Sequence, residues 1–257
     1  MQPRQGDAGR PRFSGAGIVL GVALGGFFDG ILLHQILQWH HLLSAIRPED
    51  ARFQVAADGL FHALMYLVAA AGLWMLWREQ RFGPSVSGRA LTAGLLAGFG
   101  AWNVADIVLF HWLLGIHRVR LDTADPLAWD LGWLAAFAVV PLVLAWVAAR
   151  RPPTLRGGTG AATALAALLT LTAAGWSLLP ANGSESTTVL FAPGVSQAQV
   201  MRAVAEADAR LVWMDASGEL VVLRLADPAR APGLYLKGAV LVSGAGAAAG
   251  CLSYLRT

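Results

Sequence analysis

Long apolar runs, separated by short polar segments, dominate the first 180 residues of the chain. Five of the runs are long enough to cross a bilayer, which takes about 20 residues. They cover residues 14–40, 57–77, 90–116, 128–148 and 159–180. Residues 1–12 are polar and proline-containing, which predicts a disordered tail. The pattern therefore predicts an all-α polytopic membrane bundle, with four spans in residues 13–150 and a fifth over 159–180.

From about residue 184 the apolar runs become shorter and alternate with polar residues. "TTVLFAPG" is typical of a strand, and "SQAQVMRAVAEADA" of an amphipathic helix capped by Ser196. "RLVWMDASGELVVLRL" is typical of a hairpin that turns at Ser217 and Gly218. This β-α-β-β order predicts a small ferredoxin-like α+β domain over 184–257. The alternative is a sixth span over 238–255, but that segment is rich in glycine, alanine and serine, so we favour the domain.

Composition supports the membrane class. Hydrophobic residues make up 56% of the chain and charged residues only 14%, and the mean hydropathy is +0.55. The formal charge is only +3, and the arginines fall in short loops instead of forming a stripe, which argues against nucleic-acid binding. The single cysteine, Cys251, excludes an intrachain disulfide and a thiolate metal cluster.

The arginines predict the orientation of the bundle. Nine precede the first span or lie in the second–third and fourth–fifth loops: Arg4, Arg10, Arg12, Arg78, Arg81, Arg89, Arg150, Arg151 and Arg156. Four lie in the opposite loops, among acidic residues: Arg47, Arg52, Arg118 and Arg120. Because positive residues stay inside, we expect a cytoplasmic N-terminus and, after five spans, an extracytoplasmic C-terminal domain.

An internal repeat links the first and third spans. "FFDGILLHQILQWHH" and "VADIVLFHWLLGIHR" both contain D-x4-H-x5-H, and the matching residues lie 77 positions apart (106 minus 29). The following spans also begin alike, with Asp58 and Asp130, although His62 corresponds to Leu134. Two hairpins, 14–77 and 90–148, are thus predicted to be copies related by an axis along the membrane normal.

Ionisable residues inside spans are costly and usually mark function. One residue from each of three spans is predicted at a similar depth in the outer leaflet, and these are the metal ligands we expect: His34, His62 and His111. A second shell or second site nearer the surface comprises His40, His41, His117, Asp58 and Asp130. Candidates for a midplane proton path are Asp29, Asn103 and Asp106. For Asp58 and Asp130, a helix N-cap role is the alternative, because both lie at span starts.

The spacing raises one geometric conflict. Residues five apart on an α-helix lie about 140° apart around its axis, so Asp29 and His34 do not share a face. Each outward helix then either presents two polar edges, or a local π-bulge merges them.

Three kinds of chemistry fit buried imidazoles surrounded by carboxylates. Imidazole binds copper, iron or zinc, two histidines can hold a haem, and aspartates can relay protons in a transporter or channel. A non-catalytic scaffold, in which the histidines only pack between helices, is a further alternative. We favour a metal or haem site.

The stretches "GGFFDGILLHQILQWHHLLSAI", "DGLFHALMY" and "ADIVLFHWLLGIHRVRLD" resemble a bacterial family of predicted membrane proteins of unknown function, domain of unknown function 2243. The resemblance covers about residues 15–150. It implies a bacterial inner (plasma) membrane protein and suggests an association with a respiratory oxidase or its assembly machinery. It carries no known activity, so it assigns no catalytic residue.

Overall fold

The computed structural model describes residues 13–37, 39–47, 50–82, 87–150, 159–177 and 186–244. The predicted tail over 1–12, Cys251 and most of the alternative sixth span lie outside these residues. The chain forms two units, Met1–Asp29 with His62–Ala174, and Gly30–Phe61 with Gly175–Thr257. The long helix α2 contributes to both, and each unit is described by itself.

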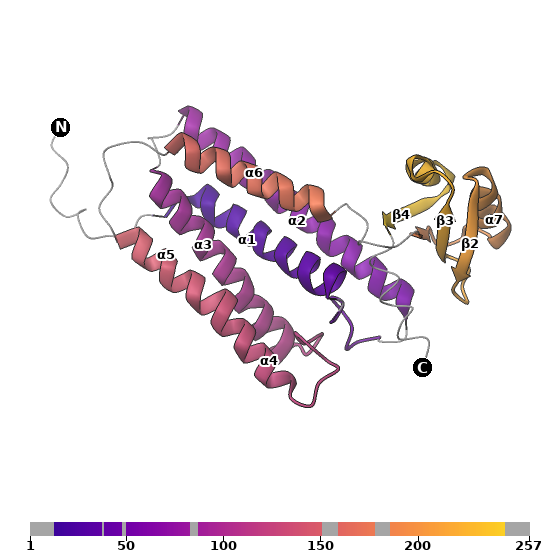
Figure 1. The fold of residues 1–257 in the computed structure, drawn as a ribbon, viewed down its shortest axis with the longest axis horizontal. Helices are drawn as coiled ribbons and strands as arrows, with labels where there is room; N and C mark the ends of the chain where they lie inside the picture. Colours follow the sequence, from indigo (N-terminus) through magenta and orange to yellow (C-terminus); the bar gives the residue numbers. More distant parts are fainter. Residues whose placement is uncertain are drawn as a thin grey trace. The chain divides into compact units, whose positions relative to one another are not determined.

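Most of the described part of the first unit is helical; α2 begins in the second unit and continues into the first. The α-helices are α1 (Gly15–Asp29), α2 (Ala51–Phe82), α3 (Gly88–Ala105), α4 (Pro126–Trp133), α5 (Val140–Arg150) and α6 (Thr159–Ser177). Two π-helical segments continue α3 and α4: η2 (Asp106–Leu113) and η3 (Leu134–Val139). Figure 1 shows how these helices lie along one another.

Among the described residues, four helical segments are long and apolar enough to cross a membrane, in agreement with the first four predicted runs. They are Gly15–His34, Arg52–Phe82, Gly88–Leu113 and Pro126–Arg150. The apolar part of α6, Gly160–Gly175, is shorter, so the fifth span stays a prediction. Large apolar side chains such as Leu67 and Leu113 are exposed on the four segments, as a helix surface that faces lipid requires.

Glycines bring the backbones of α1 and α3 into contact (Figure 1). A Cβ on Gly21 would lie 2.2 Å from the carbonyl oxygen of Leu95, and one on Gly98 would lie 2.0 Å from that of Ile18. Gly17 and Gly94 repeat the arrangement one turn earlier. Small residues at this spacing allow close packing of helices where no hydrophobic effect drives association.

Polar contacts and a small apolar cluster tie α2 and α6 to α1. Glu79 on α2 accepts hydrogen bonds from the Ser14 hydroxyl (2.7 Å) and from the Ala16 backbone N–H (3.0 Å), which caps the start of α1. Tyr66 donates to the carbonyl oxygen of Ala174 on α6 at 2.8 Å. Near the start of α1, a cluster of buried apolar side chains joins α1, α2, α3 and α6: Ala16, Leu20, Leu76, Leu91 and Ala166.

The second unit contains a four-stranded antiparallel sheet. Its elements are β1 (Thr187–Phe191), α7 (Gln197–Glu206), β2 (Ala209–Met214), β3 (Leu220–Leu225), the 3₁₀-helix η4 (Pro228–Lys237) and β4 (Ala239–Gly244). The strand order is β2-β3-β1-β4, and every neighbouring pair is antiparallel. The predicted strand, capped helix and hairpin are all present, and residues 239–244 of the alternative sixth span form a strand.

The two faces of this sheet pack against different partners. On one face Phe191 and Val221 join Val200 and Val204 of α7 in the core. On the other face Leu190 and Leu220 pack on Val55, near the start of α2. An ion pair between Arg52 and Glu219 adds to this second contact. The sheet therefore lies against the part of α2 that carries Asp58.

Candidate metal centres

A π-helical turn places the aspartate and the histidine of the D-x4-H motif on one side of the helix, which a regular α-helix would not do. Beyond Asp106, Leu114 N–H bonds to the carbonyl oxygen of Leu109 at 2.8 Å, five residues back. At the corresponding place in η1 (Gly30–Ile36), Leu37 N–H bonds to Leu32 at 2.8 Å. Wider turns bring residues five apart onto one side of the helix. Of the two arrangements considered from the sequence, the structure therefore has the π-bulge.

The first cluster, the Asp106 triad, consists of Asp106, His111 and His117. Asp106 Oδ2 lies 3.2 Å from His111 Nε2, and Asp106 Oδ1 lies 3.1 Å from His117 Nε2. The two imidazole rings meet edge to face, with centroids 4.5 Å apart. All three side chains are buried, so the triad presents one carboxylate and two imidazoles to one another away from solvent.

The loop between η2 and α4 folds back to deliver His117. Gly115 turns the chain with φ of 62°, in the left-handed region that suits glycine. Farther along, Arg120 stacks over the Trp129 ring at 5.2 Å and donates to Asp122 at 2.7 Å. That guanidinium holds the pKa of the exposed Asp122 carboxyl below its usual range.

A second carboxylate, Asp130 of α4, lies behind His111. Its Oδ1 is 2.9 Å from His111 Nδ1 and accepts from the backbone N–H of Val119 at 3.1 Å. Its Oδ2 accepts from Arg118 at 2.7 Å and from the indole N–H of Trp112 at 3.1 Å. A carboxylate only accepts, so Nδ1 of His111 carries the proton in this contact. The four donors fix both the carboxylate and the plane of the imidazole.

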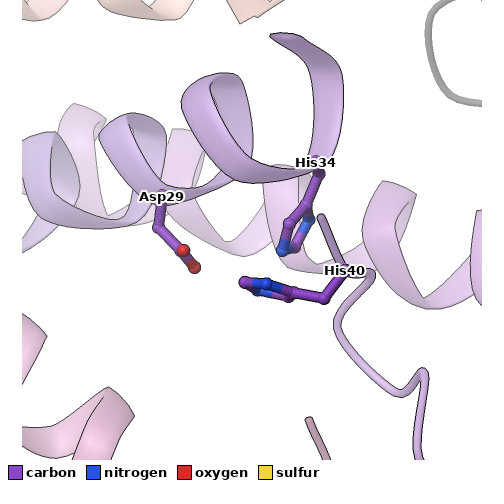
Figure 2. Close-up of side chains that lie close together, drawn as sticks. All are labelled: Asp29, His34 and His40. Atoms are coloured by element: carbon purple, nitrogen blue, oxygen red, sulfur yellow. The ribbon is translucent and has the colours of Figure 1, made fainter. Parts of the chain in front are cut away.

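The second cluster, the Asp29 triad, consists of Asp29 at the end of α1, His34 in η1 and His40 in the following loop. Figure 2 shows the three side chains pointing toward one another, with the Asp29 carboxylate directed at the His40 ring. The rings of His34 and His40 meet edge to face at 4.8 Å. The three residues are only 2%, 2% and 3% exposed.

Asp58 of α2 lies behind His34 as Asp130 lies behind His111. Asp58 Oδ1 is 3.3 Å from His34 Nδ1 and accepts from the backbone N–H of Leu42 at 2.9 Å. Asp58 Oδ2 is 2.7 Å from His41 Nδ1. Leu42 and His41 lie 77 positions before Val119 and Arg118, so the same positions make the same contacts in both clusters.

Both triads have the geometry of a ligand set. In each, one ligand atom per residue lies within 4.8 Å of the others. Two atoms that bind one tetrahedral ion with bonds of about 2.0–2.1 Å lie about 3.3 Å apart. Each oxygen of Asp106 lies close to that distance from one imidazole: Oδ2 is 3.2 Å from His111 Nε2, and Oδ1 is 3.1 Å from His117 Nε2.

The structure distributes the predicted site residues differently from the expected three-histidine set. Within the described ranges, His34 and His111 belong to different triads, and neither triad includes His62; convergence of His34, His62 and His111 stays a prediction. Asn103 bonds to Trp133 at 2.8 Å and contacts neither triad in the described interactions. Asp58 and Asp130 lie inside α2 and α4, and the N-cap of α4 is Asp125. The sequence reasoning missed Trp112 and Arg118; the repeat offset from His41 would have found Arg118.

Apolar spanning helices with buried histidine–aspartate clusters define a predicted polytopic membrane protein. The family model of predicted membrane proteins, DUF2243, matches residues 16–152, and the chain belongs to this family. The matched region contains both triads and the two aspartates behind them. No curated protein and no solved structure matches the chain.

Proposed function

We propose that this membrane protein binds one transition-metal ion in each of its two triads. The observation that carries the proposal is the orientation of His111. Its Nδ1–H is held by Asp130, 2.9 Å away, so Nε2, which faces Asp106, is the ring nitrogen that can bind a metal once it has lost its proton. Histidines that bind metals almost always donate their other ring nitrogen to a carboxylate or carbonyl in this way.

Burial supports the same proposal. The Asp106 triad and Asp130 place two carboxylates and two imidazoles at 0–2% exposure, and all of them except His117 lie on helices apolar enough to span a membrane. Isolated buried charges cost several kcal/mol each, and a divalent cation bound by the three facing atoms would offset that cost. Without a metal, a proton on His111 Nε2 has to take the place of the ion beside Asp106. Metal binding therefore amounts to exchange of that proton for an ion.

The donor set favours particular metals. Two imidazoles and one carboxylate with open positions are typical of non-haem iron(II), and two imidazoles with a carboxylate also bind zinc. Neither triad contains a thiol or thioether, which copper(I) prefers. A haem held by both histidines of one triad does not fit, because the rings meet edge to face at 4.5 and 4.8 Å.

We further propose that the hairpins 14–77 and 90–148 are duplicated. Three observations support this. Each D-x4-H-x5-H motif is followed by an aspartate that contacts Nδ1 of its first histidine, Asp58 in one copy and Asp130 in the other. Both motifs contain a π-helical turn. The α1–α3 contacts are reciprocal. Gly17 approaches Leu91 as Gly94 approaches Ser14, at an offset of 77 in both directions. Reciprocal contacts of this kind are the mark of a twofold relation.

The remaining architecture is also proposed. The strand order β2-β3-β1-β4, with α7 after β1 and η4 after β3, supports a ferredoxin-like C-terminal domain. The arginine distribution supports a cytoplasmic N-terminus and an extracytoplasmic C-terminal domain, with α6 as the fifth span. A role beside a respiratory oxidase rests on the family resemblance alone.

Elemental analysis tests the metal proposal. Purified full-length protein, loaded with zinc(II) or, without oxygen, iron(II) and then desalted, should retain two ions per chain. His111→Ala and His34→Ala should each retain one, and the double variant none. Trp129→Phe, outside both triads, should retain two. A wild type that retains no ion under either loading, or single variants that retain two, would refute the proposal.

A proton path is the second candidate, because His117, Asp106, His111 and Asp130 form a continuous chain of contacts of 2.9–3.2 Å. Such a chain can pass a proton between carboxylates. If this is the function, metal-free protein in liposomes should show proton flux that Asp106→Asn abolishes. Flux in metal-free wild type together with no metal retention would select this candidate over the first.

A further inference from the structure

Each triad has an aspartate behind it, Asp58 or Asp130. The two clusters differ in the donor that bonds to Oδ2 of this aspartate. At Asp58 Oδ2 that donor is His41 Nδ1, at 2.7 Å. At Asp130 Oδ2 it is Arg118 Nη1, also at 2.7 Å. The other shared contacts, to a histidine Nδ1 and to a backbone N–H, are the same in both centres. One position of the repeat therefore holds an imidazole in one copy and a guanidinium in the other.

This exchange changes the charge of the centre. A guanidinium is always protonated in proteins, whereas an imidazole supplies the same N–H donor without a fixed charge. The Asp29 triad with Asp58 contains two carboxylates and no fixed positive charge. The Asp106 triad with Asp130 contains two carboxylates and Arg118, whose side chain is 34% exposed beside a fully buried Asp130. Trp112, which also donates to Asp130, is neutral and does not alter this balance.

We propose that Arg118 makes the Asp106 triad the weaker of two unequal sites for divalent cations, and that the Asp29 triad is the stronger. This inference rests on the proposed metal binding and adds the residue that sets the difference. Arg118 repels the bound cation. Its ion pair with Asp130 also weakens the effect of that carboxylate on His111, whose basicity as a metal ligand the carboxylate raises. At an effective dielectric of about 20 and a charge separation of roughly 10 Å, unscreened repulsion of a divalent ion corresponds to about two orders of magnitude in affinity. Because Arg118 is partly exposed and paired with Asp130, solvent and that carboxylate screen its charge, and we take tenfold as the lower bound. Arg118 is a positioning residue, since it acts through Asp130 and touches no ligand atom of the triad in the described contacts.

The test measures zinc(II) affinity by competition with a chelator, in full-length protein at about pH 8, where free imidazole is neutral. His111→Ala isolates the Asp29 triad, and His34→Ala isolates the Asp106 triad. We expect the isolated Asp29 triad to bind about tenfold or more tightly than the isolated Asp106 triad. In the His34→Ala background, Arg118→Gln should tighten binding tenfold or more, whereas Arg118→Lys, which keeps the charge, should leave it weak.

The reciprocal change completes the test: in the His111→Ala background, His41→Arg should weaken the Asp29 triad. Tighter binding by Arg118→Gln cannot come from misfolding, so this variant decides the question. Equal affinities of the two isolated triads, or no gain in Arg118→Gln, would overturn the inference while leaving the metal proposal intact. No zinc or iron in the wild type would overturn the metal proposal itself. Two ions per wild-type chain would uphold the metal proposal, so that equal affinities would then count only against the role of Arg118.

Discussion

The α1–α3 contact allows a prediction that does not depend on any metal. We expect Gly98→Ala to destabilise the helical bundle strongly. A Cβ at Gly98 would lie 2.0 Å from the carbonyl oxygen of Ile18, whereas ordinary contacts begin at 3.4 Å. The atom in the way belongs to the backbone of α1, so no side-chain rotation can relieve the clash. Relief requires the two helices to separate locally by up to 1.4 Å (3.4 minus 2.0).

The cost of that separation follows from packing. A radial gap of 0.5–1 Å already forfeits a quarter to a half of the dispersion energy of the atoms concerned, and overpacking typically costs about 1–3 kcal/mol and occasionally more. Since the shift exceeds that range, we expect a loss of about 3 kcal/mol. Gly21→Ala should cost nearly as much, because its Cβ would lie 2.2 Å from the Leu95 carbonyl oxygen. Equal losses at Gly21 and Gly98 would agree with a twofold relation between the helices.

The assay is reversible unfolding in mixed micelles of mild detergent and dodecyl sulfate, followed by circular dichroism. Gly132→Ala is the matched control, because a Cβ there meets nothing within 4 Å and alanine is the better helix former by up to about 1 kcal/mol. It should unfold like the wild type or slightly later. If Gly98→Ala unfolds with the free energy of Gly132→Ala, the close approach of α1 and α3 is wrong.

Three further predictions concern other parts of the chain. Asp130→Asn should weaken zinc(II) binding at the Asp106 triad about 10–100-fold in the His34→Ala background, measured by chelator competition; an unchanged affinity would contradict the role of Asp130. In the wild type, zinc(II) retention at both triads should fall as the pH drops below about 6, because the imidazoles must be neutral to bind; retention that stays constant to pH 5 would argue against histidine ligands. Reporter fusions at Gly83 and Thr257 should lie on opposite sides of the membrane, with Thr257 outside; a cytoplasmic Thr257 would favour the sixth span over 238–255.

Hydrophobic patterning predicted the spanning helices well, because run length is a direct physical requirement of the bilayer. The predicted run 90–116 corresponds to Gly88–Leu113, and 128–148 to Pro126–Arg150. The first run was predicted to continue to residue 40, but its helical part ends at Ile36. The difference matters, because His40 lies in the loop and returns toward Asp29 instead of continuing outward along the helix. Helix periodicity carries no signal for where a chain leaves the helix and folds back.

The grouping of the site residues into two triads was harder to predict than the residues themselves. All six triad residues were candidates from the sequence, but depth along ideal α-helices grouped them by layer, with His34 beside His111. The π-helical segments η1 and η2 instead group them by repeat, since a wider turn brings Asp106 and His111 to one side. A π-bulge replaces one hydrogen-bonding register with another, and no residue type in "DIVLFHWL" indicates where it occurs. The D-x4-H spacing was itself the signal, because it is unsuited to an α-helical face.

The two centres keep the same contacts although the chain between their parts differs in length. Leu42 and Asp58 are 16 positions apart, whereas Val119 and Asp130 are 11 apart. Even so, each backbone N–H reaches Oδ1 of the aspartate, at 2.9 and 3.1 Å. A contact that only filled space would not need to survive a change of five residues in the connecting loop. A contact that orients an imidazole would, because turning His34 or His111 by a fraction of a turn would move its Nε2 away from the facing aspartate. The constant geometry around Asp58 and Asp130 therefore supports a function for the imidazoles, and the one contact that differs, His41 against Arg118, is where the two centres should differ in what they bind.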